Sequence, residues 1–149
     1  MIVTVVSFLA ILLTAISFAP AAAHLFELTH KISLGQNDYF VVQGIYRGWA
    51  LFGFPLCGSI AANLTLAALL RRTGLPFLLA TGAGLLMIAT LAIFFIWTFP
   101  ANQATLNWTM IPSNWRDLRQ QWEYSHAVNG IITFVALSLS VLAGLTARR

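Results

Sequence analysis

The sequence predicts an all-α fold, a four-helix transmembrane bundle, on the basis of three observations. Of the 149 residues, 59% are apolar and only 8% are charged, whereas soluble domains carry about 25% charged residues. The apolar residues gather in four stretches, each long enough for the roughly 20 residues that a spanning helix needs. Turn-forming residues separate the stretches. We therefore expect an integral membrane protein whose main partner is the lipid bilayer.

The helices are expected over residues 2–33, 38–71, 75–99 and 114–147, within a single domain that takes in residues 1–149. Gly35 suits the end of the first helix. Gly74 and Pro76 suit a tight turn between the second and third helices. Pro100 is expected to close the third helix, because proline lacks the N–H donor that a helix interior uses. An irregular, polar segment should then lead into the fourth helix.

The first stretch has a second interpretation. Ala21, Ala22 and Ala23 resemble a signal-peptidase site, and cleavage there would leave His24 as the new N-terminus. No Lys or Arg precedes the apolar run, however, and the helical pattern continues beyond Ala23. We expect the first stretch to be a spanning helix.

The basic residues predict the orientation in the membrane. Arg71, Arg72, Arg148 and Arg149 should lie on one side of the bundle together with the N-terminus. Cytoplasmic loops are enriched in Lys and Arg, so both termini are expected in the cytoplasm, as in a multi-pass protein of a bacterial inner membrane. The basic residues form no single patch, so no nucleic-acid partner is predicted. The acids are all expected on the outer side: Glu27, Asp38, Asp117 and Glu123.

The segment 102–129 stands out because it is polar and aromatic between two long apolar runs. It holds three of the five tryptophans, Trp108, Trp115 and Trp122. No charged residue occurs between Arg72 and Arg116. Any function is therefore expected near this segment, on the outward face of the membrane.

One face of the fourth helix carries a stripe of aromatic and polar side chains. Trp115, Arg119, Trp122, His126 and Asn129 are spaced four, three, four and three residues apart, so they share that face. Polar side chains facing lipid are costly, and the stripe is therefore expected to face the bundle interior as a binding or functional surface. The alternative is an interfacial aromatic belt combined with structural hydrogen bonds.

The first helix offers a matching pair. His24 and Glu27 lie three residues apart, which is about 4.5 Å of axial rise. Such a pair can be a general base with its orienting carboxylate, or two ligands of a metal ion. It can also be a purely structural part of an ion pair. Counting outward from the turn near Gln36 places Tyr46 and Arg47 of the second helix at a similar depth, which makes Arg47 the expected counter-ion of Glu27.

These residues are expected to converge in one outward-facing pocket. His24, Glu27, Arg47, Asn102 and His126 should lie at similar depth, with Trp115 and Trp122 as walls. The full set expected to contact a ligand is Tyr46, Asn102, Trp108, Trp115, Arg119, Trp122 and Asn129.

The same residues resemble those of a known family. His24-Leu25-Phe26-Glu27-Leu28, then Pro100-Ala101-Asn102, then Trp115, Arg119, Trp122 and His126 are similar to motifs of a family of four-helix membrane proteins that includes the fungal anthrone oxygenases. The resemblance covers the whole chain and implies an oxygenase without a bound cofactor. Such an enzyme deprotonates an anthrone-like polycyclic aromatic, and the carbanion then reacts with dioxygen.

Roles for individual residues follow from that resemblance. It implies that His126 or His24 is the general base and that Glu27 orients His24. Arg47, Arg119 or Asn102 would stabilise the enolate oxygen. Trp115 and Trp122 would stack on the flat substrate and exclude water.

Two other functions are open at this point. A non-catalytic membrane protein that binds a small apolar ligand or a partner helix needs only a pocket with stacking aromatic side chains. A metal-site protein would hold a transition metal with His24, Glu27 and His126, which are suitable N and O ligands. The polar residues would otherwise only lock the four helices together.

Overall fold

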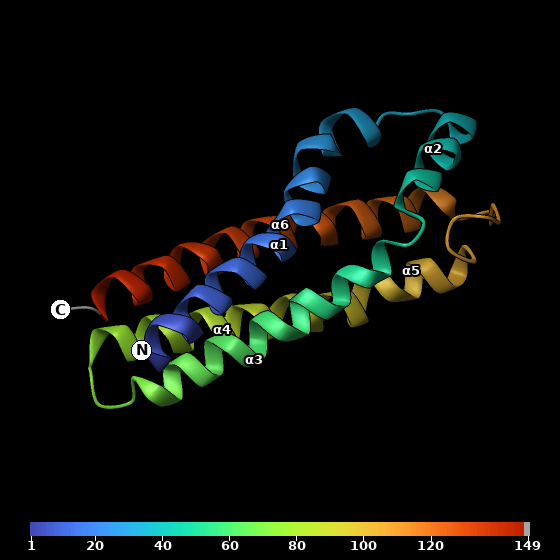
Figure 1. Cartoon of the computed structure of the whole chain (residues 1–149). Helices are drawn as coiled ribbons and strands as arrows, with labels where there is room; N and C mark the ends of the chain where they lie inside the picture. Colours follow the sequence, from blue (N-terminus) through green and yellow to red (C-terminus); the bar gives the residue numbers. More distant parts are fainter. Residues whose placement is uncertain (148–149) are drawn as a thin grey trace.

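Four long helices run side by side and form the bundle in the computed structural model, which describes residues 1–147 (Figure 1). They are α1 (Ile2–Lys31), α3 (Gly53–Leu69), α4 (Leu75–Ile93) and α6 (Trp115–Thr146). The predicted all-α four-helix bundle is therefore confirmed. Arg148 and Arg149, part of the predicted basic side, lie outside the described residues.

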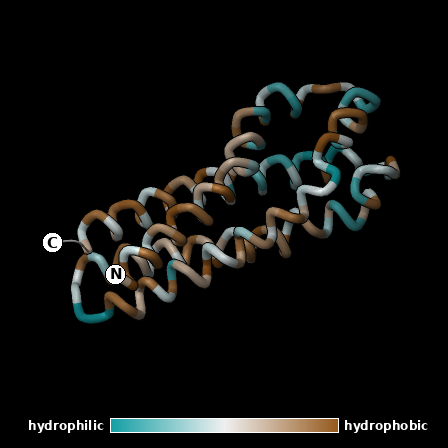
Figure 2. The backbone as a smooth tube through the Cα atoms, viewed as in Figure 1, coloured by the Kyte–Doolittle hydropathy of each residue, from teal (hydrophilic) through white to brown (hydrophobic). Residues whose placement is uncertain are grey.

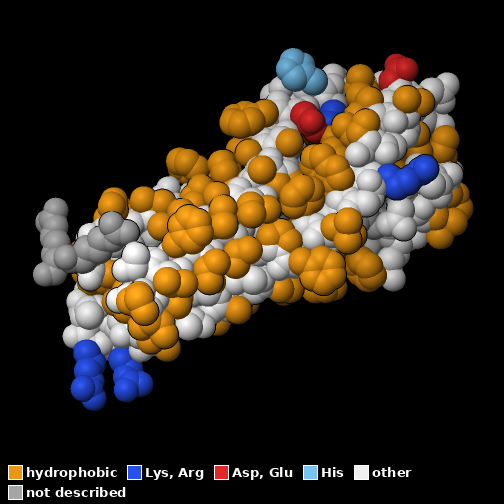
Figure 3. All heavy atoms as spheres, in the orientation of Figure 1, with side chains coloured by type: hydrophobic (Ala, Val, Ile, Leu, Met, Phe, Trp, Pro, Cys, Tyr) orange, Lys and Arg blue, Asp and Glu red, His pale blue; other side chains and the backbone are white. Residues whose placement is uncertain are grey.

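The distribution of side chains is that of a membrane protein. Small residues fill much of the interior, including the fully buried Ala10, Ala80 and Ala143, while Phe54 and Leu78 are more than half exposed. Hydrophobic side chains cover the visible face along the middle of the bundle (Figure 3). Segments of hydrophilic residues gather toward its two ends (Figure 2). Exposed apolar side chains of this kind match lipid rather than water.

Within residues 1–147, four segments are long and apolar enough to cross a bilayer: Ile2–Lys31, Trp49–Leu69, Leu75–Ala104 and Trp115–Thr146. Together with the lipid-like surface, they define a multi-pass integral membrane protein with four spans.

A buried polar layer joins three of the helices within the bundle. Asn63 of α3 donates to Thr14 of α1 at 3.1 Å and accepts from Ser140 of α6 at 2.7 Å. All three side chains have no exposed surface. Hydrogen bonds of this kind hold helices together in lipid, where burial of apolar surface gives little driving force.

The backbones of α1 and α6 approach each other closely at Gly130. A Cβ atom built on Gly130 would lie 2.8 Å from the carbonyl oxygen of Ala21, so glycine is required for the two helices to meet there. Pro20 lies inside α1, and beyond it the last turns of α1 rise away from α6 (Figure 1). Proline inside a helix removes one backbone hydrogen bond and commonly bends it.

The second span differs from the prediction, which was one continuous helix over residues 38–71. The chain instead forms α2 (Gln36–Gln43), two 3₁₀ turns, η1 (Gly44–Tyr46) and η2 (Trp49–Phe52), and only then α3. The break lies at Arg47, which is extended, and at Gly48, whose φ of 90° is open mainly to glycine. Because of this break, α2 lies at the end of the bundle opposite the two termini (Figure 1).

The third span also differs, because the prediction that Pro100 closes it is wrong. The helix passes through the wide π turn η3 (Phe94–Thr98) into α5 (Phe99–Ala104), and Pro100 stands in the first turn of α5. Proline is tolerated in a first turn, where its missing N–H costs nothing. Asn102 is therefore helical.

The connection from α5 to α6 is irregular, as predicted. Leu106, Asn107 and Trp108 have φ values of 48°, 55° and 63°, in a region that is unfavourable for residues other than glycine. Local hydrogen bonds hold them there: Asn107 N–H donates to the Asn102 carbonyl at 2.7 Å, and Trp108 N–H donates to the Thr105 hydroxyl at 3.1 Å. The strained turn directs Trp108 back under α5.

The N-terminus, the C-terminal end of α6 and the α3–α4 turn with Arg71 and Arg72 lie at one end of the bundle (Figure 1). Segment 102–114 and α2 lie at the other. This separation is the one predicted. The side of the membrane that each end faces stays a prediction from the basic residues.

Candidate functional site

An aromatic cap closes the end of the bundle opposite the termini. Tyr39 of α2, Trp108, and Trp115 and Trp122 of α6 are buried against one another, with Ala101 of α5 beneath them. The Tyr39 ring lies edge-on to the Trp108 ring at 5.2 Å between centroids. The cap holds α2 on the bundle and encloses the polar groups described next.

An ion pair between α1 and α6 is buried below this cap. The Nζ atom of Lys31 lies 3.0 Å from Oε1 of Glu123, and these side chains are 5% and 0% exposed. Tyr39 donates its hydroxyl proton to the same Glu123 oxygen at 2.9 Å, and Gln43 donates to the Tyr39 hydroxyl at 2.5 Å. The second Glu123 oxygen, Oε2, is buried without a hydrogen-bond partner, and so is Gln43 Oε1.

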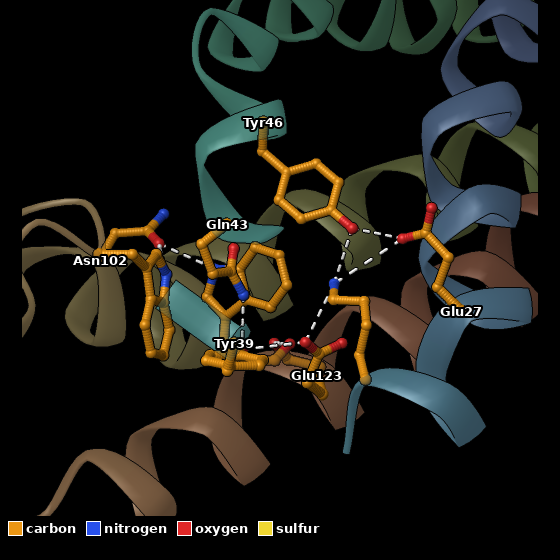
Figure 4. A network of polar contacts seen from close by, with 10 residues as sticks. Glu27, Tyr39, Gln43, Tyr46, Asn102 and Glu123 are labelled. Atoms are coloured by element: carbon orange, nitrogen blue, oxygen red, sulfur yellow. Dashed lines mark hydrogen bonds and ion pairs between the residues drawn. The ribbon is translucent and has the colours of Figure 1, made fainter. Parts of the chain in front are cut away.

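The network continues from Lys31 toward the surface. Lys31 donates to the Tyr46 hydroxyl at 2.8 Å, and that hydroxyl donates to Glu27 Oε2 (Figure 4). The Glu27 side chain is 37% exposed and its Oε2 lies 3.8 Å from Lys31 Nζ. A continuous series of hydrogen-bonding groups therefore connects a partly exposed carboxylate to one that is fully buried.

The two tyrosines of the network remain protonated across the physiological range. Burial raises the pKa of Tyr39 well above its usual value, and the neighbouring Glu123 carboxylate raises it further. Burial also raises the pKa of the half-buried Tyr46, as does its hydrogen bond to Glu27. Both hydroxyls therefore act as donors to carboxylates.

The two histidines meet, as expected from their depth. The rings of His24 on α1 and His126 on α6 are 4.1 Å apart between centroids and tilted by 32°. Trp122 lies against both, at 5.0 Å from His24 and 4.2 Å from His126. Tyr46 and Trp49 lie 4.6 and 5.4 Å from the His24 ring. This set of five rings, His24, Tyr46, Trp49, Trp122 and His126, is called the histidine cluster below.

The histidine cluster is partly open. His24 is only 4% exposed, whereas His126, Tyr46 and Trp49 are half-buried. His24 Nδ1 is buried and has no hydrogen-bond partner. This nitrogen is therefore not engaged by any group within residues 1–147.

Asn102 fixes two of the tryptophans. Its side-chain oxygen accepts a hydrogen bond from the indole N–H of Trp122 at 2.8 Å and another from that of Trp108 at 3.1 Å. It is the helical extension through η3 that carries Asn102 to this position. Asn102 therefore orients the wall of the histidine cluster, and its amide nitrogen is not used in these bonds.

Arg119 acts as a clamp on the cap. Its guanidinium donates to the backbone carbonyl of Leu34 at 2.7 Å and lies over the rings of Trp115 and Tyr39, at 4.8 and 5.4 Å from their centroids. Such a stacked, hydrogen-bonded guanidinium ties the turn after α1 to α6. Trp115 is accordingly part of the cap and lies apart from the histidine cluster.

The predicted Glu27–Arg47 ion pair is wrong. Within the described residues, Glu27 pairs with Lys31 and accepts from Tyr46, and Arg47 is exposed. The cause is the chain break at Gly48, which turns Arg47 outward instead of continuing one helix into the bundle. Glu27 is likewise bonded to Tyr46 and Lys31, not to His24.

Asn129 takes no part in the histidine cluster. Its side-chain nitrogen donates to the Thr90 carbonyl of α4 at 3.2 Å, while its oxygen is buried without a partner. Asn129 therefore links α6 to α4.

The expected metal ligands do not assemble. In residues 1–147, no group of three or more His, Cys, Asp or Glu side chains is placed to hold a metal ion. His24 and His126 meet through their ring faces, and Glu27 is engaged by Tyr46 and Lys31.

A groove of about 450 Å³ lies elsewhere on α6. It runs between α6 and the α4–η3 segment, and its walls include Trp97, Gln121, Tyr124 and Val128. At 100° per residue, these α6 positions lie on the face opposite Trp122 and His126. The groove is therefore separate from the histidine cluster.

Sequence reasoning missed the central roles of Lys31, Glu123, Tyr39 and Gln43. One signal was available. Lys31 lies four residues after Glu27, on the same face of the first helix as His24 and Glu27, and this spacing places a positive charge at that depth. Glu123 follows Trp122 directly and lies next to the predicted stripe. Glu123 was expected among the acids of the outer side, whereas the cap buries it together with Lys31.

Fold and surface define the class of this protein as a four-span integral membrane protein. Comparisons with protein-family models, with curated proteins and with solved structures found no match. The resemblance to anthrone oxygenases therefore rests on the sequence motifs alone.

Proposed function

We propose that the histidine cluster binds a flat aromatic molecule and removes a proton from it, and that the resulting carbanion reacts with dioxygen. The observation that carries the proposal is the stacking of His24 on His126 beside Trp122. Two neutral imidazoles held against aromatic rings provide a base within a surface suited to a planar ligand.

Each neighbour of the pair has a role in this chemistry. The histidine pair accepts the proton: His126 is the more exposed ring, and His24 Nδ1 has no hydrogen-bond partner within residues 1–147. Trp122 and Trp49 contact the faces and edges of the ligand. Lys31 provides positive charge beside the developing enolate, because its Nζ lies 4.4 Å from the Tyr46 centroid and 4.8 Å from the Trp122 centroid. This role replaces the one expected of Arg47.

The reaction balances without a bound cofactor. An anthrone loses a proton from its central CH₂ group to the histidine pair, and the carbanion adds dioxygen to give a hydroperoxide after reprotonation. Loss of water from the hydroperoxide then leaves a carbonyl group. One anthrone and one dioxygen therefore give one quinone and one water.

Labelled oxygen tests this proposal. Detergent-purified protein is supplied with anthrone under ¹⁸O₂, and oxygen uptake, quinone absorbance and quinone mass are followed together. We expect one oxygen consumed per quinone and one ¹⁸O atom in the quinone, at a rate above that of anthrone in the same detergent alone. A rate equal to that of detergent alone would contradict the proposal.

A non-catalytic binding protein is the second candidate. The same five rings offer aromatic surface to an apolar ligand, and binding requires no free imidazole nitrogen. Quenching of tryptophan fluorescence by anthrone without oxygen uptake would favour this candidate over the oxygenase.

A further inference from the structure

The buried ion pair described above has no role in the proposed chemistry beyond its charge. Glu123 has no exposed surface, and its only hydrogen-bond donors in the described residues are Lys31 and Tyr39. The carboxylate Oε2 has none. A carboxylate that is buried and only half satisfied is costly to keep charged, and binding a proton relieves that cost.

A path for such a proton leads to the surface. Lys31 contacts Glu123 on one side and the Tyr46 hydroxyl on the other. Tyr46 in turn donates to Glu27, whose side chain is 37% exposed. Figure 4 shows the Tyr46 hydroxyl directed toward Glu27, with Glu123 on the other side of the network and dashed lines marking the contacts. Each contact along this path, from Glu123 through Lys31 and Tyr46 to Glu27, is a hydrogen bond or a close ion pair, which is the geometry that proton transfer requires.

We propose that Glu123 is a buried proton-binding site that exchanges its proton with the outer end of the molecule through Lys31, Tyr46 and Glu27. The inference shares Lys31 and Tyr46 with the surroundings of the histidine cluster, but it does not depend on the proposed oxygenase, because it needs neither the histidines nor a substrate. It assigns to this membrane protein a route for protons from its surface into the interior of the bundle.

The transfer balances as a series of three steps. The Lys31 ammonium gives a proton to Oε1 of Glu123 and becomes an amine. Tyr46 gives its hydroxyl proton to that amine, and protonated Glu27 gives its proton to the Tyr46 oxygen. At the end Lys31 is again an ammonium and Tyr46 again a phenol. One proton has moved from Glu27 to Glu123, and no electron or other reactant is involved.

Other charged and titratable groups surround the site. The groups near Glu123 are Lys31 and Glu27 on α1, Tyr39 on α2 and Tyr46 on η1. Arg119 of α6 lies over the Tyr39 ring, and the two histidines lie around Trp122. The Tyr39 hydroxyl accepts a hydrogen bond from Gln43, which is itself buried. Among the described residues, the contacts through Tyr39 therefore reach no exposed group. The hydrogen-bonded path to Glu27 therefore runs through Tyr46.

Tyr39 and Tyr46 give a matched pair of variants. Tyr46→Phe and Tyr39→Phe each remove one hydroxyl that belongs to the network and keep the ring in place. Only the first variant removes the hydrogen-bonded path to Glu27, because the remaining direct contact between Lys31 Nζ and Glu27 Oε2, at 3.8 Å, is longer than a hydrogen bond. The second removes a hydrogen bond from Glu123 itself and so identifies the infrared band of that carboxyl group by shifting its frequency. Glu123→Gln, which should abolish the band, gives a second identification.

The experiment is infrared spectroscopy of the purified protein in lipid, titrated with acid and then transferred to D₂O. We expect a protonated-carboxyl band that shifts in Tyr39→Phe. In Tyr46→Phe its hydrogen–deuterium exchange should slow about tenfold or more, the factor for losing one hydrogen bond to a charged group. Tyr39→Phe should exchange at the wild-type rate. Equal exchange in Tyr46→Phe and wild type would overturn the proposal, and so would the absence of such a band wherever circular dichroism shows an intact fold.

Discussion

Lys31 Nζ lies 3.0 Å from Glu123 Oε1, and this contact joins the last turn of α1 to the third turn of α6 beneath the aromatic cap. It is the point at which the outer end of the bundle is held together. The same lysine reaches Tyr46 and thereby Glu27. Stability, proton access and the charge beside the histidine cluster all depend on one side chain.

Lys31→Met tests the ion pair. The change leaves Glu123 buried without its cation, and breaking a buried pair in this way costs about 3–5 kcal/mol. The double variant Lys31→Met/Glu123→Met, which removes both charges, should be more stable than Lys31→Met alone. Unfolding by denaturant in mixed micelles measures both. If the double variant is less stable than Lys31→Met, the stability lost in Lys31→Met does not come from breaking the ion pair with Glu123.

Gly130→Ala tests the packing of α1 on α6. The new methyl group would lie 2.8 Å from a backbone oxygen, that of Ala21, and the helices must separate to admit it at about 1–3 kcal/mol. Gly53→Ala is the control, because nothing lies within 4 Å of its added methyl group. Thermal unfolding of the two variants should differ clearly, with Gly53→Ala close to wild type.

Stability should fall in alkaline solution. Burial raises the pKa of both Tyr39 and Tyr46 in the folded state. Above the usual tyrosine pKa of about 10, the unfolded chain loses protons that the folded chain keeps, so the free energy of unfolding decreases as pH rises. Below that pH the contribution is fully present. Tyr39→Phe should flatten the decrease, and an unchanged slope would exclude Tyr39 as a cause.

The orientation predicted from Arg71 and Arg72 can be measured by cysteine labelling. In a Cys57→Ser background, Ser113→Cys and Thr73→Cys place single thiols on exposed residues at opposite ends of the bundle. A membrane-impermeant maleimide applied to intact cells should label Ser113→Cys, whereas Thr73→Cys should react only after lysis. The reverse pattern would place the histidine cluster on the cytoplasmic side.

The helices could be predicted because a helix that spans a lipid bilayer requires a sequence feature that is easily recognised. A span needs about 20 apolar residues in succession, and such runs are visible without knowledge of packing. The stripe of Trp122 and His126 was also visible, because polar groups in a span must face inward. His24 and His126 accordingly meet as their positions indicated.

The parts that were not predicted depend on local backbone geometry or on long-range contacts. Gly48 breaks the second span through a φ of 90°, and nothing in the spacing of apolar residues marks that conformation. The π turn at Phe94–Thr98 carries the helix past Pro100, and the spacing of apolar residues does not indicate that turn either. Once the chain turns at Gly48, Arg47 leaves the site and Lys31 takes its place as the cation of Glu27.

The most direct test of the central claim is the rate of anthrone oxidation by variants of the histidine pair. His24→Gln and His126→Gln should each lower the rate about 10²-fold or more, the usual contribution of a general base. His30→Gln is the matched control on the same helix, because His30 is exposed and outside the cluster; it should oxidise anthrone at the wild-type rate. A double variant, His24→Gln/His126→Gln, that folds and oxidises anthrone as fast as wild type would contradict the account.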